Sequence, residues 1–159
     1  MNLIDYITTH PLFIKTMTEI EQAEADRIYC RHGLAHGLDV ARIAYIRVLT
    51  EHLPYTKDVV YAAGLLHDIG RLEEKRIGIS HDRAGAALAE QVLRDTPFTP
   101  GEKTMILNAI RFHRSADAGH DDFSLLIYQA DKASRNCFLC AAADSCYWET
   151  EKRNMFIKD

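Results

Sequence analysis

The segment VVYAAGLL, from Val59 to Leu66, is apolar almost all round. Such a segment has no face that suits water, so it predicts a central helix packed on every side by other elements. It runs directly into His67 and Asp68. An aspartate there is desolvated and lies at the carbonyl end of a helix, where the macrodipole favours cations. We therefore expect a positive group close to Asp68.

Helix signals dominate the rest of the chain and strand signals are nearly absent, which predicts an all-α fold. The clearest helix start is TPGE, where Thr99 is the expected cap and Glu102 its reciprocal partner in a capping box. That helix should run to about His113. The other expected helices each have a cap or a breaker at one end, and they are Pro11 to about Tyr29 or Cys30, about His36 to Pro54, Thr56 to His67, residues 81–93 after Ser80, and residues 122–143 after Asp121 or Asp122.

A length of 159 residues suits one domain over residues 1–159. With 47% hydrophobic and 26% charged residues, the composition is that of a globular protein and not of a disordered one. The net charge of −4 argues against an extended nucleic-acid surface. The chain shows no secretory signal and no apolar run that could span a bilayer, so we expect no membrane partner and a cytoplasmic location, where cysteines are thiols or ligands.

Several ionisable residues fall at comparable places, at helix ends or on a mostly buried helix face. A lone histidine on an apolar helix is more often a hydrogen-bonded core residue than a ligand. The order His, His-Asp, Asp on separate helices is much less expected by chance, and buried carboxylates are rarely unpaired. One explanation covers the whole set, a metal centre of four imidazoles and two carboxylates made by His36, His67, Asp68, His81, His113 and Asp131.

This ligand set constrains the metal. Imidazole and carboxylate without thiolate suit divalent iron, manganese, zinc or nickel. Six side chains exceed what one catalytic ion needs while it keeps an open position, so two ions that share Asp68 use them better. Two ions about 3.5–4 Å apart can clamp a phosphate and generate the nucleophile. A cationic centre would also stabilise an ionised Asp68 at a helix C-terminus.

Three motifs of the chain are similar to those of a known superfamily. HGLDVARIA, GLLHDIGRL and YQADKASR resemble the HD-domain metal-dependent phosphohydrolase superfamily, over roughly residues 30–136. The resemblance implies a single HD-domain helical bundle with a C-terminal Cys-containing extension over about residues 137–159. It also implies that the metal ligands are His36, His67, Asp68 and Asp131. The Val-Ala pair that follows favours His36 over His32 as the first ligand.

The segments SHDRAGAALAEQVL and LNAIRFHR resemble a dinuclear branch of this superfamily, which includes bacterial diadenosine tetraphosphate hydrolases. This resemblance implies that His81 and His113 complete a second metal site. It also implies a small-molecule phosphorylated substrate, a nucleotide or a dinucleotide polyphosphate.

Basic residues cluster near the expected ligands in sequence. Charges of this kind are usually solvated, but guanidinium forks match phosphate oxygens well. Arg135 is one helical turn beyond Asp131 and should lie over the same site. Arg71, directly after the His-Asp turn, is the second candidate. Candidate proton donors near this turn are Glu73, Glu74 and Lys75.

The stretch SRNCFLCAAADSCYWETEKRN departs from the diadenosine hydrolases. We expect Cys137 and Cys140 on one helix face, with Cys146 soon after. Together with Cys30 they form either a structural zinc site of four thiolates or a set of small buried hydrophobic residues, and the lack of paired Cys-x-x-Cys knuckles favours the second interpretation. Trp148 and the charged residues after it form either a lid or a homo-oligomer contact.

The leading hypothesis is a phosphohydrolase with a dinuclear centre, in which a metal-activated hydroxide attacks phosphorus and Arg135 or Arg71 orients the phosphate. Asp68 then counts as both a ligand and a catalytic residue. Three alternatives stay open. They are a mononuclear 5′-nucleotidase, an HD-type diiron oxygenase and a non-catalytic nucleotide sensor.

Overall fold

The computed structural model describes residues 2–114 and 121–159. Within these residues every regular element is a helix, so the predicted all-α fold is confirmed. The α-helices are α1 (Leu3–Thr8), α2 (Pro11–Ala23), α3 (Leu34–Thr50), α4 (Lys57–Leu66), α5 (Arg71–Ile77), α6 (His81–Arg94), α7 (Pro100–Phe112) and α8 (Asp122–Ala133). Three short 3-10 helices follow, η1 (Cys137–Leu139), η2 (Ala143–Ser145) and η3 (Thr150–Lys152).

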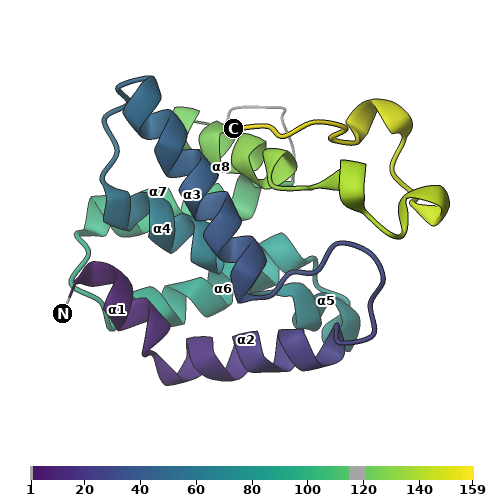
Figure 1. Ribbon diagram of the computed structural model, residues 1–159. Coiled ribbons are helices and arrows are strands. Elements are labelled where there is room, and N and C mark those ends of the chain that lie inside the picture. The colour runs from purple at the N-terminus through teal and green to yellow at the C-terminus, as the bar shows by residue number, and fades with distance from the viewer. Residues whose placement is uncertain (1, 115–120) are drawn as a thin grey trace.

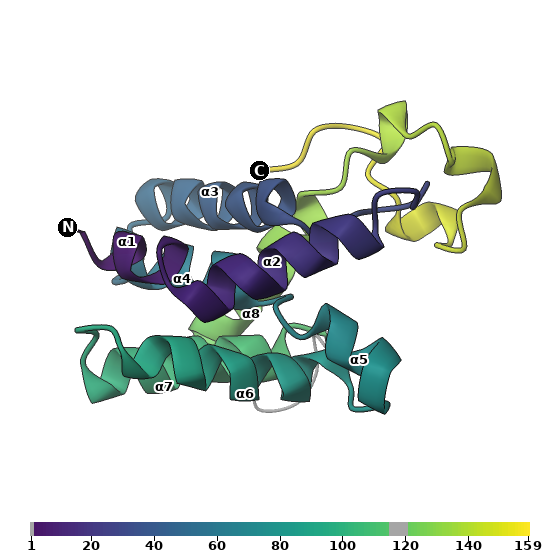
Figure 2. The same ribbon diagram turned by 90° about the horizontal axis from the view of Figure 1, so that it is seen from below.

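The helices form a layered bundle around α4 and α8. Both of these helices contact α3 on one side and α7 on the other, and α6 packs outside α7. Figure 2 shows this order, with α3 along one side and the α6–α7 pair along the other. The segment after α8 extends from the end of the bundle away from the N-terminus (Figure 1).

Helix α4 occupies the centre that its sequence predicts. All its residues from Val59 to Leu66 are buried except Tyr61. Gly64 allows α3 to approach closely, because a Cβ there would lie 2.7 Å from the Ala41 side chain. This close packing brings the end of α4, with its His-Asp pair, against the beginning of α3.

The predicted helix starts agree with the observed caps. Thr99 and Glu102 form the expected capping box at the start of α7. The Thr56 side chain accepts a hydrogen bond from the Val59 amide at the start of α4. The Asp121 side chain caps α8 in the same way. Local sequence therefore determines where these helices begin.

Two predicted helix ends are wrong. Helix α2 ends at Ala23, before Tyr29 or Cys30, and a loop follows in which the Glu24 carboxylate accepts hydrogen bonds from the His32 amide and ring, each at 2.7 Å. Helix α8 ends at Ala133 and not near residue 143. The carbonyls of Lys132 and Ala133 at this end, and of Arg135 just after it, accept hydrogen bonds from the side chain of Asn154, which is distant in sequence. Cys137 and Cys140 consequently do not share an α-helical face.

Among the described residues, no helix combines the length and the apolar character that crossing a membrane requires.

Candidate metal centre

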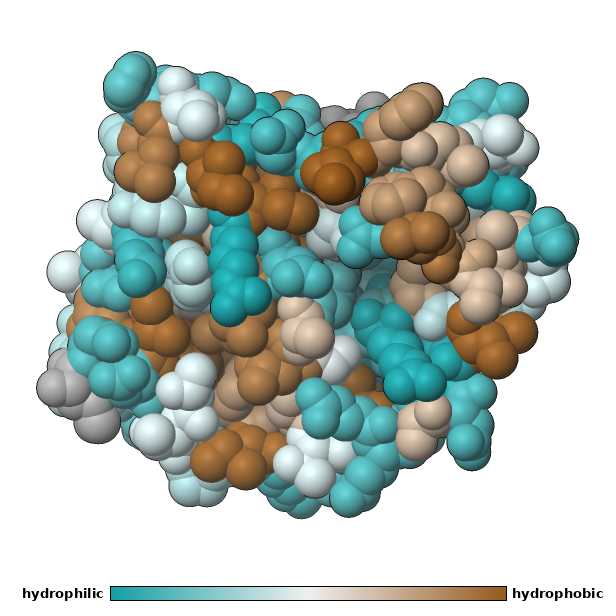
Figure 3. Space-filling model, viewed as in Figure 1, coloured by the Kyte–Doolittle hydropathy of each residue, from teal (hydrophilic) through white to brown (hydrophobic). Residues whose placement is uncertain are grey.

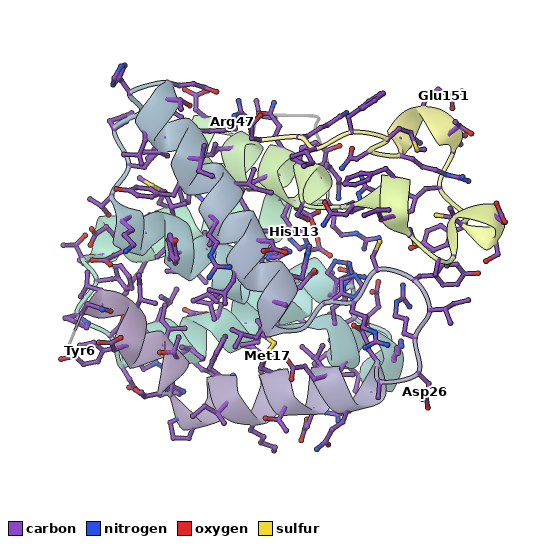
Figure 4. The ribbon with its side chains drawn as sticks, viewed as in Figure 1. Tyr6, Met17, Asp26, Arg47, His113 and Glu151 are labelled. Carbon is purple, nitrogen blue, oxygen red and sulfur yellow. The ribbon has the colours of Figure 1, made fainter. Side chains whose placement is uncertain are left out.

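The structure brings all six predicted ligand side chains together inside the bundle. Figure 4 shows the labelled His113 in the middle of the molecule, behind α3. Each side chain comes from the end or the inner face of a helix. His36 lies in the first turn of α3, His67 and Asp68 lie at the end of α4, His81 begins α6, His113 caps α7, and Asp131 lies on α8.

Asp68 lies between two pairs of histidines. Its Oδ2 atom lies 3.1 Å from His67 Nε2 and 3.4 Å from His36 Nε2. Its Oδ1 atom lies 3.5 Å from His113 Nε2 and 3.6 Å from His81 Nε2. Only 4% of the Asp68 surface is exposed. One carboxylate thus presents a different oxygen to each pair of imidazoles.

The two histidine pairs have matching geometry. The Nε2 atoms of His36 and His67 lie 3.1 Å apart, and those of His81 and His113 lie 3.2 Å apart. In each pair, together with Asp68, one atom of each residue lies within 4.8 Å of the others, which is close enough to hold a metal ion. Asp131 Oδ1 adds a second carboxylate oxygen 3.2 Å from His36 Nε2.

In three of these histidines the second ring nitrogen, Nδ1, forms a hydrogen bond with a protein oxygen. The pairs are His67 Nδ1 with the Gly64 carbonyl at 2.7 Å, His113 Nδ1 with the Ile110 carbonyl at 2.6 Å, and His81 Nδ1 with the Glu74 carboxylate at 2.8 Å. Carbonyl and carboxylate oxygens only accept hydrogen bonds, so Nδ1 donates in each pair. The Nε2 lone pairs then face one another, an arrangement that a bound cation stabilises.

Electrostatics around the centre keeps both carboxylates ionised. Burial acts to raise the pKa of Asp68, but the surrounding histidines, with His67 foremost, hold that pKa well below its usual value. The pKa of Asp131 is also lowered against burial, mainly through the hydrogen bond with His36. Burial lowers the pKa of His81 to about 4, so its imidazole is neutral at pH 7. Ionised carboxylates and a neutral imidazole are the forms that bind metal.

The pKa of His36 is the exception. Burial acts to lower it, but hydrogen bonds with Asp131 and Asp68 raise it to about 9. A proton on His36 therefore compensates the carboxylates when no cation does, and a metal ion at this position would replace that proton.

A cavity of about 650 Å³ opens beside the centre. Three candidate ligands line it, His81, His113 and Asp131. The other charged lining residues are mostly cations, Arg71, Arg114, Lys132, Arg135, Lys152 and Lys158, with Glu151 as the acid. A cavity with this balance of charge favours an anionic ligand.

Both predicted arginines line this cavity. Arg71 Nε donates a hydrogen bond to Asp68 Oδ1 at 3.0 Å, so it is one of the positive groups expected beside Asp68. The Arg135 guanidinium lies 4.5 Å from the centre of the Trp148 ring. Trp148 is itself part of the cavity wall, as a lid would be.

Some residues behave differently from expectation. The three candidate proton donors, Glu73, Glu74 and Lys75, are not among the residues that line the cavity. Glu74 instead holds His81. Lys152 and Lys158 reach the cavity from the C-terminal segment. The sequence named neither lysine as a site residue, and it left the charged residues after Trp148 as either a lid or a homo-oligomer contact.

Comparison with known proteins gives two kinds of relative. A protein of unknown function from Clostridium beijerinckii is 34% identical over 157 residues, which cover 99% of each chain. Ribonuclease Y of Enterococcus faecalis is 31% identical over 127 residues, or 80% of this chain and 22% of that one. Ribonuclease Y of Thermus thermophilus is 30% identical over 67% of this chain and 17% of that one. The chain thus matches about a fifth of the length of these ribonucleases.

The fold also has a counterpart among solved structures. A predicted HD superfamily hydrolase from an uncultured Thermotogales bacterium superimposes with a TM-score of 0.63 at 23% identity, over 98% of this chain and 88% of that one. The model of the HD domain family matches residues 33–147, which include all six candidate ligands. The chain therefore belongs to the HD-domain family.

Proposed function

We propose that this protein is a phosphohydrolase whose dinuclear metal centre is held by the four histidines and two aspartates. Membership of the HD-domain family and the His/Asp groups support a metal-dependent hydrolase. The observation that carries the dinuclear assignment is Asp68, whose two oxygens face two separate histidine pairs. A buried carboxylate in this position is suited to bridge two cations.

Each ion would have its own protein ligands. His36, His67, Asp131 and Asp68 Oδ2 would hold the first, and His81, His113 and Asp68 Oδ1 the second. Bound divalent ions supply Lewis acidity and activate a water molecule for attack on phosphorus. Iron, manganese, zinc and nickel all suit this set of imidazoles and carboxylates.

The residues around the centre would bind and orient the substrate. The basic residues of the cavity balance the charge of a phosphate, and Arg71 and Arg135 present guanidinium groups that match its oxygens. Tyr128 and Trp148 add aromatic side chains to the same cavity, next to which a base can pack. These features support a small phosphorylated metabolite as the substrate, in particular a nucleotide or a dinucleotide polyphosphate.

The dinuclear assignment is tested by removing ligands of each half of the centre. We expect His81→Ala and His113→Ala to lower kcat by at least about 100-fold, as His36→Ala should, since ligand loss costs more than loss of an outer partner. The metal content of the His/Asp centre should fall from about two ions per chain to about one. If the His81 and His113 variants kept wild-type activity, the centre would be mononuclear.

A second substrate class is favoured by one observation. Relatives named ribonuclease Y, by that name enzymes that cleave RNA, match 80% of this chain. A phosphodiester in RNA would use the same centre. We expect nucleotides to be hydrolysed faster than a short oligoribonucleotide, and the reverse order would assign the site to RNA. Iron-dependent oxygen consumption without phosphate release would instead identify an oxygenase.

A further inference from the structure

All four cysteines of the chain meet at one place outside the His/Asp centre. Cys30 lies on the loop between α2 and α3, and the other three lie on the segment after α8, more than 100 residues away. All four line a single cavity of about 210 Å³, and all are free of disulfides. None is buried, so they are not the small core residues that the sequence favoured.

The spacing of the sulfur atoms discriminates between metal sites. A tetrahedral zinc ion with Zn–S bonds of about 2.3 Å holds its sulfurs about 3.8 Å apart. Among the described residues, the groups of three or more potential ligands within 4.8 Å of one another are both made of His and Asp. The cysteine sulfurs are therefore too widely spaced for one zinc ion. In an iron–sulfur cluster the thiolates surround a larger, polyatomic group.

The size and the charge of the cavity agree with such a group. Its 210 Å³ is several times the volume of about 30 Å³ that a water molecule occupies in the liquid. Arg135 and Arg153 also line it, and these cations compensate the negative charge of ligating thiolates. Partial desolvation raises the pKa of Cys30, Arg135 lowers it and the other three cysteines raise it, so Cys30 is close enough to each of them to interact.

The cysteine segment also lacks a core of its own. In the part of the chain after Arg135, Ala142 and Asn154 are the buried residues, and Leu139 is 82% exposed. The segment nevertheless has a defined path, because the Arg153 guanidinium donates hydrogen bonds to the carbonyls of Ala143, Cys146 and Trp148. Segments with so little apolar burial are usually stabilised by a disulfide or a metal.

We propose that Cys30, Cys137, Cys140 and Cys146 ligate an iron–sulfur cluster that holds the C-terminal segment against the bundle. The cluster and the His/Asp centre are separate sites with a common wall. Arg135, Tyr147 and Trp148 line both the cysteine cavity and the cavity beside the His/Asp centre. The cluster therefore positions part of the proposed substrate site. Figure 3 shows the surface hollowed between the bundle and this segment.

The first test measures iron and acid-labile sulfide in the full chain purified without oxygen. We expect about four sulfide ions and at least four iron ions per chain, since a [4Fe–4S] cluster on four cysteines supplies four of each and the His/Asp centre can add iron, with the visible absorption of thiolate-bound iron. Sulfide is the decisive quantity, because the His/Asp centre can bind iron but not sulfide. Asp68→Ala should therefore keep its sulfide, whatever the outcome for the proposed hydrolase.

Variants connect the cluster to the cysteines. Cys137→Ser should lose the sulfide and the visible absorption, whereas the matched control Ser145→Ala, next to Cys146 on an exposed position, should keep both. Loss of the cluster should also raise KM, and the fold-change in KM should exceed that in kcat by about tenfold. The reason is that losing the cluster loosens the wall shared by the two cavities but leaves the His/Asp centre in place.

Two outcomes would overturn the proposal. They are wild-type protein without sulfide, whether or not it holds a tightly bound zinc ion, and a Cys137→Ser variant that retains its full sulfide. If Cys137→Ser does not fold, the sulfide content of the wild-type chain alone decides.

Discussion

Asp68 is the residue on which the proposed chemistry depends. It is buried, and it accepts a hydrogen bond from Arg71 while its two oxygens face four imidazoles. A carboxylate with these neighbours stays ionised, which its lowered pKa reflects. Its negative charge is shared between both halves of the centre, so changing it should affect both halves together.

The first prediction concerns Asp68→Asn. The amide is close in size but carries no charge, so it cannot bridge two cations. We expect kcat/KM to fall by at least about 1000-fold, which corresponds to about 4 kcal/mol of transition-state stabilisation. Apart from iron that accompanies sulfide at the cysteine site, metal analysis should find less than one ion per chain, with an unchanged circular dichroism spectrum. A variant that retained two ions would contradict the bridging role.

The second prediction concerns Glu74, the partner of His81 Nδ1. Glu74→Gln keeps the size of the side chain but weakens its hold on the imidazole. Outer partners of metal ligands change metal affinity by about 10–100-fold, so we expect a loss of this size at the second site. Titration of metal-free protein with manganese measures it. The control is Glu73→Gln, whose carboxylate contacts Arg76 and not a ligand. Equal losses in both variants would contradict the prediction.

The meeting of the six side chains was predictable because histidine and ionised aspartate at buried helix positions are unusual and require one another. Their role as ligands stays a prediction. The groups that orient the imidazoles were not predictable. The Gly64 and Ile110 carbonyls are backbone atoms, which have no signature in the sequence. The sequence indicated Glu74 only as a candidate proton donor, since the direction in which its side chain points depends on how α5 packs against α6.

At the scale of elements, the turn after α4 is fixed by its contact with α6. Gly70 lies directly against the α6 backbone, so that a Cβ there would come within 2.2 Å of the His81 carbonyl oxygen and 2.3 Å of the Gly85 amide nitrogen. Backbone atoms cannot move aside as a flexible side chain can. The separation between Asp68 and His81 therefore depends on a glycine at this position.

The third prediction is that Gly70→Ala destabilises the fold by about 2 kcal/mol or more, because the added methyl group forces α5 and α6 apart. Denaturant unfolding measures this change. The control is Gly101→Ala near the start of α7, where a Cβ would meet no atom within 4 Å. That change should be neutral or stabilise by up to about 1 kcal/mol. Equal stability of the two variants would contradict the predicted clash.

The capped helix starts were predictable, and the two wrong helix ends, those of α2 and α8, have a physical reason. Caps such as Thr99 with Glu102 lie within four residues, so the sequence contains the whole interaction. The end of α8 depends on Asn154, about twenty residues further on, and the loop after α2 depends on the Glu24–His32 pair. Helix α5 is short and mostly charged, and it carries no apolar periodicity that predicts it.

At the scale of the whole molecule, the six candidate ligands come from five helices, because His67 and Asp68 both lie at the end of α4 and the others belong to α3, α6, α7 and α8. The two proposed ions, which share Asp68, would therefore link these five helices at the centre. Since the unfolded chain cannot present these ligands together, metal binding favours the folded state.

The fourth prediction follows from this linkage. A metal present at 100 to 1000 times its Kd stabilises the fold by about 2.7–4.1 kcal/mol, so a chelator should lower the Tm of the metal-loaded protein by about 5–15 °C. Differential scanning calorimetry measures the shift. Asp68→Asn is the control, because a protein that holds little metal at the centre should respond much less. A decrease in Tm that persists in Asp68→Asn but disappears in Cys137→Ser would come from metal at the cysteine site instead. A wild-type Tm that did not change with the chelator, after metal analysis had shown the ions to be removed, would mean that the centre does not hold the helices together.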